Sequence, residues 1–80
     1  MLSPEITLTG IVTASSWDKN NEVDGITIAV DGEKEYIIVY RKHIEQLIPL
    51  IRREIEVTGK LTTDAAGNNY LSISNCRIIK

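Results

Sequence analysis

His43 and Cys76 form the one pairing of a base with a thiol nucleophile in this sequence, which holds a single histidine and a single cysteine. A catalytic thiol needs a neighbouring base or cation that stabilises its thiolate. Here the histidine lies at the start of a predicted helix and the cysteine lies in the last predicted strand, where a lone cysteine usually behaves as a small hydrophobic residue. The sequence also contains no glycine-rich phosphate loop, Ser-His-Asp set or paired-carboxylate motif. We therefore expect no catalytic residue, no enzymatic activity and no cofactor.

Acidic and amide side chains between Asp18 and Asp24 are the second group that could do chemistry, because carboxylate and amide oxygens bind calcium. The spacing matches a calcium-binding loop only in part, since Val23 stands where the sharp turn requires glycine and no distal glutamate follows. One histidine and one cysteine supply too few ligands for zinc. We expect no metal site, with a weak divalent-cation site on this loop as the alternative.

Aromatic and basic side chains form the third group, because proteins that bind single-stranded nucleic acid stack bases on aromatic rings and contact phosphates with cations. The candidate ligand-binding residues are Trp17, Thr27, Tyr36, Tyr40, Arg41, Lys42 and Lys60.

The distribution of charge argues against a nucleic-acid partner. Nine basic and eleven acidic residues give a net charge of −2, whereas dedicated nucleic-acid binders are usually basic. Residues 18–35 hold two basic against six acidic side chains, and residues 41–60 hold five basic against three acidic ones. The sequence predicts a surface with both signs, made of Asp18, Glu22 and Asp24 on one side and Arg52 and Arg53 on the other. Such a surface suits a protein partner or a second copy of the chain, with Trp17 and Tyr40 as aromatic anchors.

The elements that position these residues are mainly strands. Apolar and polar residues alternate, as is typical of half-buried strands, over residues 6–14, 25–30, 35–40, 54–62 and 70–79. Asp31-Gly32 predicts a hairpin turn between the second and third strands. The alternation changes phase near Ser74-Asn75, which predicts a bulge in the last strand.

A helix interrupts the strands. Apolar residues at 44, 47, 48 and 51 follow helical spacing. Pro49 should end the helix near Leu47 or Ile48, because the residue before a proline disfavours the helical conformation. We expect a helix of about two turns whose apolar face covers the core.

This order of three strands, a short helix and two strands, with Gly10 in the first strand and Gly59 in the fourth, resembles the OB-fold. Segments 10–14, 17–18, 35–38, 47–48 and 57–61 are similar to small stand-alone bacterial OB-fold proteins of unassigned function. The resemblance implies an all-β, five-stranded Greek-key barrel with one short helix between the third and fourth strands, formed by residues 1–80 as a single domain. It also implies a ligand on the second and third strands, flanked by the first–second and fourth–fifth loops.

The third strand has two possible orientations. Tyr36, Ile38 and Tyr40 either form an outward stripe over this ligand face or point into the core, and the small size of the barrel favours the core. The predicted core consists of Ile6, Leu8, Val12, Ile26, Ile28, Val30, Ile55, Val57, Leu61, Leu71, Ile73 and Ile78.

Two functions remain open for such a module. The first hypothesis is weak, sequence-tolerant binding of single-stranded nucleic acid or another oligomer on the strand 2–3 face. The alternative is a protein-interaction or self-association module, present as a monomer or a weak homodimer. No apolar run approaches the ~20 residues of a membrane span, and one cysteine forms no internal disulfide. We expect a cytoplasmic protein without a membrane partner.

Overall fold

The computed structural model describes residues 5–30 and 34–80. Its strands are β1 (Glu5–Trp17), β2 (Val23–Val30), β3 (Lys34–Ile38), β4 (Glu54–Thr63) and β5 (Asn69–Ile78). Between β3 and β4 lie the helix α1 (Arg41–Leu47) and the 3₁₀ turn η1 (Ile48–Leu50). The predicted order of strands and helix is confirmed, whereas the predicted Asp31-Gly32 turn lies outside the described residues.

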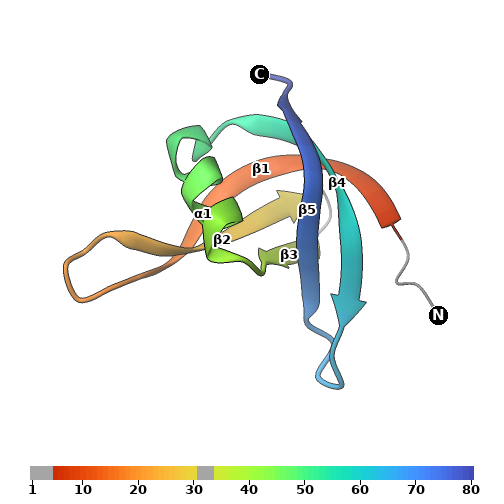
Figure 1. The fold of residues 1–80 in the computed structure, drawn as a ribbon, viewed down its shortest axis with the longest axis horizontal. Helices are drawn as coiled ribbons and strands as arrows, with labels where there is room; N and C mark the ends of the chain where they lie inside the picture. Colours follow the sequence, from red (N-terminus) through yellow and green to blue (C-terminus); the bar gives the residue numbers. More distant parts are fainter. Residues whose placement is uncertain (1–4, 31–33) are drawn as a thin grey trace.

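The five strands close into a barrel in the order β1-β2-β3-β5-β4 (Figure 1). Neighbouring strands are antiparallel except β3 and β5, which run parallel over residues 36–38 and 69–71. β1 serves both halves of the barrel, because its first part pairs with β4 and its second part pairs with β2. The fold is therefore an all-β barrel of the OB type with one short helix between β3 and β4, as predicted.

Two strand boundaries differ from the prediction in ways that affect the surface. β1 continues past Ala14 to Trp17, because two irregularities in its register let it stay paired with β2 as both strands bend. As a result the β1–β2 hairpin reaches beyond the body of the barrel (Figure 1). β3 ends at Ile38, before the predicted Tyr40, since the chain must turn there to begin α1 at Arg41.

Glycines allow close contact between strands at two bends. A Cβ atom at Gly10 would lie 2.6 Å from the carbonyl oxygen of Ala29, and one at Gly59 would lie still closer to the carbonyl oxygen of Ser72. The register of β4 against β5 shifts beside Gly59, where Ser74 is the extra residue. This shift confirms the predicted bulge, which sharpens the bend of β5.

The core draws on all five strands and α1. Its buried apolar side chains are Val12, Ile26, Ile28, Ile38, Ile44, Leu47, Ile55, Val57 and Leu71. Half-buried members of the predicted core pack against them: Ile6, Leu8, Val30 and Ile73. The prediction for Ile78 is wrong, because its side chain is 50% exposed although it pairs with buried Ile55. The pairing of β5 with β3 ends at Leu71, so among the described strands only β4 lies beside β5 at Ile78.

The helix forms where the apolar spacing predicts it. α1 ends at Leu47, and Pro49 lies in the following 3₁₀ turn, where its missing N–H costs no helical hydrogen bond. Ile44 and Leu47 are buried in the core cluster, so the helix covers the barrel interior. No helix in the described parts of the chain is long and apolar enough to cross a membrane.

Candidate binding surfaces

The orientation of β3 determines which side chains a ligand can reach on the barrel. Tyr36 stands in register with Ile28, which is fully buried, and cross-strand partners share a face. Ile38 is 3% exposed, and Tyr36 packs against the core. The core placement of both residues is confirmed, and the outward stripe does not form.

The outer face of β1, β2 and β3 carries two rows of other side chains. The rows are Thr13–Thr27–Ile37 and Ile11–Ala29–Glu35. Thr27, a predicted ligand-binding residue, is only 5% exposed, and its carbonyl oxygen accepts a hydrogen bond from Thr13 Oγ1 at 3.0 Å. Neither row contains an aromatic or basic side chain. This part of the barrel therefore lacks the groups that stack on bases or contact phosphates.

Tyr40, Arg41 and Lys42 are exposed together at the start of α1. The Tyr40 ring meets the His43 ring edge to face, with centroids 5.7 Å apart and planes at 84°. Arg41 Nε lies 3.4 Å from Glu45 Oε2, in an ion pair whose two side chains are mostly exposed. The structure thus keeps one aromatic and two basic members of the predicted set on one small surface.

Lys60 lies on another side of the barrel. It is in register with Glu5 of β1 and Ser72 of β5, because β4 lies between these two strands. β2 and β3 are not neighbours of β4. The structure therefore does not bring Lys60 to the other predicted ligand-binding residues.

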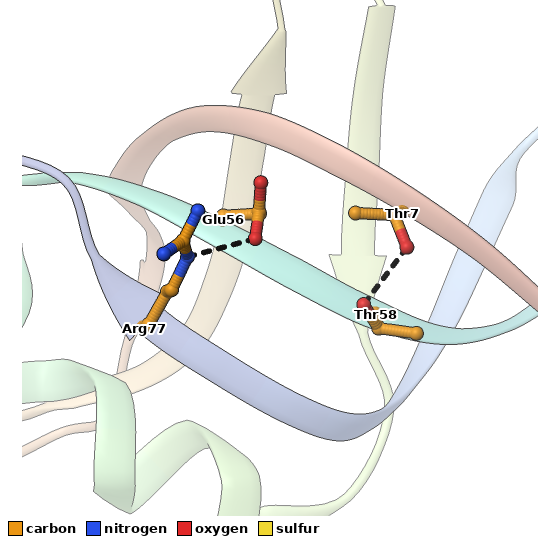
Figure 2. A network of polar contacts seen from close by, with 4 residues as sticks. All are labelled: Thr7, Glu56, Thr58 and Arg77. Carbon is orange, nitrogen blue, oxygen red and sulfur yellow. Dashed lines mark hydrogen bonds and ion pairs between the residues drawn. The ribbon is translucent and has the colours of Figure 1, made fainter.

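A set of paired polar side chains, here called the polar ladder, covers the outer face of β1, β4 and β5 (Figure 2). The hydroxyl oxygens of Thr7 and Thr58 are 2.9 Å apart. Arg77 Nε donates a hydrogen bond to Glu56 Oε1 at 2.8 Å. Cross-strand pairs of this kind stabilise a sheet, so these four side chains find their partners within the chain.

Trp17 is 57% exposed, the highest value among the exposed large hydrophobic residues of the described chain. It lines a pocket of about 400 Å³ between the end of β1, the start of β2 and the turn before β4. The lining residues are Val12, Thr13, Ala14, Trp17, Val23, Ile51 and Arg52. This volume lies within the range of small-ligand sites. We call it the Trp17–Arg52 pocket.

Arg52, which the sequence placed only on the surface with both signs, lines this pocket beside Trp17. Its φ angle of 72° is left-handed, a conformation that costs a residue with a Cβ atom roughly 1–2 kcal/mol. Its N–H donates a hydrogen bond to the carbonyl oxygen of Val12 at 2.8 Å, and Val12 N–H donates one to the carbonyl oxygen of Arg53 at 3.1 Å. β1 therefore holds this turn in place. Glycine and asparagine usually mark such a conformation, so an arginine gives no signal in the sequence.

The acidic loop between β1 and β2 is shaped by its own side chains. Asp18 Oδ1 accepts hydrogen bonds from the N–H groups of Asn20 at 2.8 Å and Glu22 at 3.0 Å. Ser16 Oγ donates to Asp24 Oδ1 at 2.6 Å. Among the residues that the structure describes, no group of three or more histidine, cysteine or acidic side chains could hold a metal ion. The carboxylates order the loop beside the Trp17–Arg52 pocket.

His43 and Cys76 lie far apart in the sequence but line one pocket of about 330 Å³ between α1 and β5. The other lining residues are Lys42, Gln46, Ile73, Ser74 and Asn75. Burial, and to a smaller extent the Lys42 charge, lowers the pKa of His43. Its Nδ1 atom is buried without a hydrogen-bond partner in the described structure, and the Cys76 thiol is exposed. Among the residues that the structure describes, no carboxylate lines this pocket to complete a catalytic triad.

Asp64 organises the turn between β4 and β5. It accepts hydrogen bonds from the N–H groups of Ala66 at 3.0 Å and Asn68 at 2.9 Å, and from the Tyr70 hydroxyl at 3.1 Å. The bonds from Asn68 are the main cause that lowers the pKa of Asp64, and the same carboxylate raises the pKa of Tyr70. The turn is therefore held by a charged acceptor.

Comparisons of the chain with protein-family models, curated proteins and solved structures gave no significant match. The fold defines the class, an all-β barrel of the OB type with one helix between β3 and β4. Because one fold hosts many unrelated functions, the function has to be argued from the surfaces themselves.

Proposed function

We propose that this chain is a non-catalytic module that binds a protein partner at the Trp17–Arg52 pocket. The observation that supports the proposal is the pocket itself, a mostly apolar pocket of about 400 Å³ lined by the exposed Trp17 and by Arg52. Tryptophan and arginine are enriched among the few residues that dominate the binding energy of protein interfaces. The apolar walls add surface whose burial favours association.

The charge around the pocket favours a protein over a nucleic acid. Asp18 follows Trp17 directly, and Glu22 and Asp24 flank Val23, so carboxylates adjoin two lining residues. Carboxylates repel a phosphate backbone. A protein partner can present basic and acidic side chains at separate points and so match both signs.

Single-stranded nucleic acid is the second candidate ligand, favoured by the exposure of Trp17. An exposed indole can stack on a base, which is worth about 1–3 kcal/mol. Arg52 lines the same pocket and offers a cation for a phosphate. The response to salt separates the two candidates, because phosphate contacts weaken steeply as salt rises and apolar contacts do not.

Two experiments on the full chain test the proposal. In an amide NMR titration with mixed single-stranded oligonucleotides, we expect no shifts around Trp17 at low or moderate salt. In affinity capture, we expect a protein that the wild-type chain and the Lys60→Ala variant retain and the Trp17→Ala variant loses. Oligonucleotide shifts at Trp17 that disappear with salt would overturn the protein proposal in favour of nucleic acid.

The proposal also includes a relationship to small bacterial OB-fold proteins, a cytoplasmic setting and a monomeric or weakly dimeric state, all of which rest on the sequence. Sedimentation at rising protein concentration distinguishes the monomer from the homodimer.

A further inference from the structure

The Trp17–Arg52 pocket is chemically asymmetric. Of the seven lining residues within the described parts of the chain, five are apolar and Arg52 alone is charged. On the side of the β1–β2 loop, the residues next to Trp17 and Val23 are the acidic Asp18, Glu22 and Asp24. The described lining thus has a positive residue on its β4 side, and carboxylates are next in sequence to its lining residues on the loop side.

Arg52 stands at a position where the fold alone favours glycine. Its left-handed φ of 72° is strained for arginine, and such strained residues are concentrated at functional sites. Within residues 5–30 and 34–80, the Arg52 guanidinium forms no ion pair or hydrogen bond. By contrast, Arg53 Nε donates to the carbonyl oxygen of Lys80 and Arg77 Nε donates to Glu56. No described residue therefore competes for the Arg52 guanidinium.

We infer that the pocket binds an extended peptide segment in which apolar residues lie between an acidic and a basic residue. An apolar side chain fills the cavity against Trp17, the acidic residue contacts Arg52, and the basic residue faces the loop carboxylates. This inference rests on the proposed function, because it specifies the chemistry of the protein partner. A nucleic acid fits less well, since it brings phosphates to both sides of the cavity and meets the acidic loop.

An amide NMR titration with short synthetic peptides tests the inference. The mixed-charge peptides contain Asp-Leu-Leu-Lys or the reverse, Lys-Leu-Leu-Asp, because either chain direction satisfies the two charges. The comparison peptides contain Lys-Leu-Leu-Lys, Asp-Leu-Leu-Asp or Asp-Ser-Ser-Lys, and none has an aromatic residue. We expect one mixed-charge peptide to shift the Trp17 indole and Arg52 amide signals most strongly. The same-charge peptides should bind about twofold to fivefold more weakly, and the serine peptide should cause no shift.

Two variants control for indirect effects. Arg52→Gly relieves the left-handed strain, so the variant should stay folded while its affinity for the mixed-charge peptide falls about twofold to fivefold. The Arg52→Gly variant should also bind the mixed-charge peptide and the Lys-Leu-Leu-Lys peptide with equal affinity. Lys60→Ala changes a cation that does not line the pocket and should leave the affinity unchanged.

The outcomes separate this inference from the proposed function. Equal binding of all leucine peptides whatever their charge, shifts only at another surface, or no shifts with any peptide would each overturn the inference. The capture experiment with Trp17→Ala judges the proposed function independently of these peptides. An oligonucleotide that displaces the mixed-charge peptide from Trp17 would contradict both.

Discussion

The polar ladder and the Trp17–Arg52 pocket both include residues of β1, yet they differ in where their side chains find partners. In the ladder, Thr7 pairs with Thr58 and Arg77 pairs with Glu56. In the pocket, Trp17 is 57% exposed, and the Arg52 guanidinium has no partner among the described residues. Surface side chains whose polar groups pair within the chain contribute to the stability of the sheet. The proposal assigns Trp17 and Arg52, which lack such partners among the described residues, to contacts with another molecule.

The largest effect is expected beneath the ladder, at Val57. This side chain is fully buried, and Val57→Asp would place an unpaired carboxylate in the core. The cost of several kcal/mol is comparable with the roughly 5–15 kcal/mol that stabilises a small domain. We expect circular dichroism to show no cooperative thermal transition. The control Thr58→Val changes the next, outward position and should keep the transition, whereas a native melting curve for Val57→Asp would refute the inward face of β4.

The next largest changes in the free energy of unfolding are expected at two left-handed positions, one occupied by Arg52 and one by Gly67. Arg52→Gly removes a left-handed arginine and should raise the free energy of unfolding by up to about 1 kcal/mol. Gly67 has a φ of 89°, so Gly67→Ala should lower it by about 1 kcal/mol. Denaturant unfolding of both variants measures the two changes. A stability loss in Arg52→Gly would show that the arginine side chain supports the fold, contrary to the assignment.

Arg77→Ala tests how much the ladder contributes. The Arg77 side chain is 70% exposed and the Glu56 side chain 33% exposed, so solvent and salt screen the pair. We expect the free energy of unfolding to fall by less than about 1 kcal/mol, with a smaller difference in high salt. Urea titrations at low and high salt measure this difference. A loss of several kcal/mol would show that this exposed pair is a main support of the sheet.

The smallest expected effect on stability is confined to the turn between β4 and β5 and depends on pH. Hydrogen bonds to Asp64 lower its pKa from the usual value of 3.8, so folding favours the charged form. Its contribution to stability is therefore complete above that value and is lost as the pH falls through the lower, folded pKa. NMR in acid should show the amide signals of Ala66 and Asn68 moving with a midpoint below 3.8, and Asp64→Asn should abolish that titration. A midpoint above the usual value would contradict the hydrogen-bonded turn.

The sequence was sufficient to predict those features of the fold that depend on local spacing. Alternation placed Ile55 and Val57 in the core, the change of phase placed the bulge at Ser74, and Pro49 marked the end of the helix. Ile78 continued the alternation but lies beyond the last pairing of β5 with β3. Its exposure depends on where another strand ends, and spacing within one strand does not contain that information.

The candidate site was harder to predict, because it depends on contacts between distant segments. The alternation of β3 left the orientation of Tyr36 open, and its pairing with Ile28 decided that orientation. Thr27 faces outward but is covered, which composition does not reveal. Trp17 was predicted as a binding residue because aromatic rings stack on bases and anchor interfaces, and the structure shows that its side chain is exposed. Arg52 was expected only as part of a charged surface, because its place beside Trp17 depends on a left-handed turn held by Val12, 40 residues earlier in the chain.

The location of the binding site at the Trp17–Arg52 pocket is tested most directly by acrylamide quenching of tryptophan fluorescence, because Trp17 is the only tryptophan. In the free chain we expect strong quenching, since the side chain is largely exposed. Saturation with the preferred mixed-charge peptide should protect Trp17 from quenching in the wild type, and the same peptide concentration should protect it less in Arg52→Gly. A peptide that binds by calorimetry but leaves the quenching of Trp17 unchanged would place the site elsewhere and contradict this assignment.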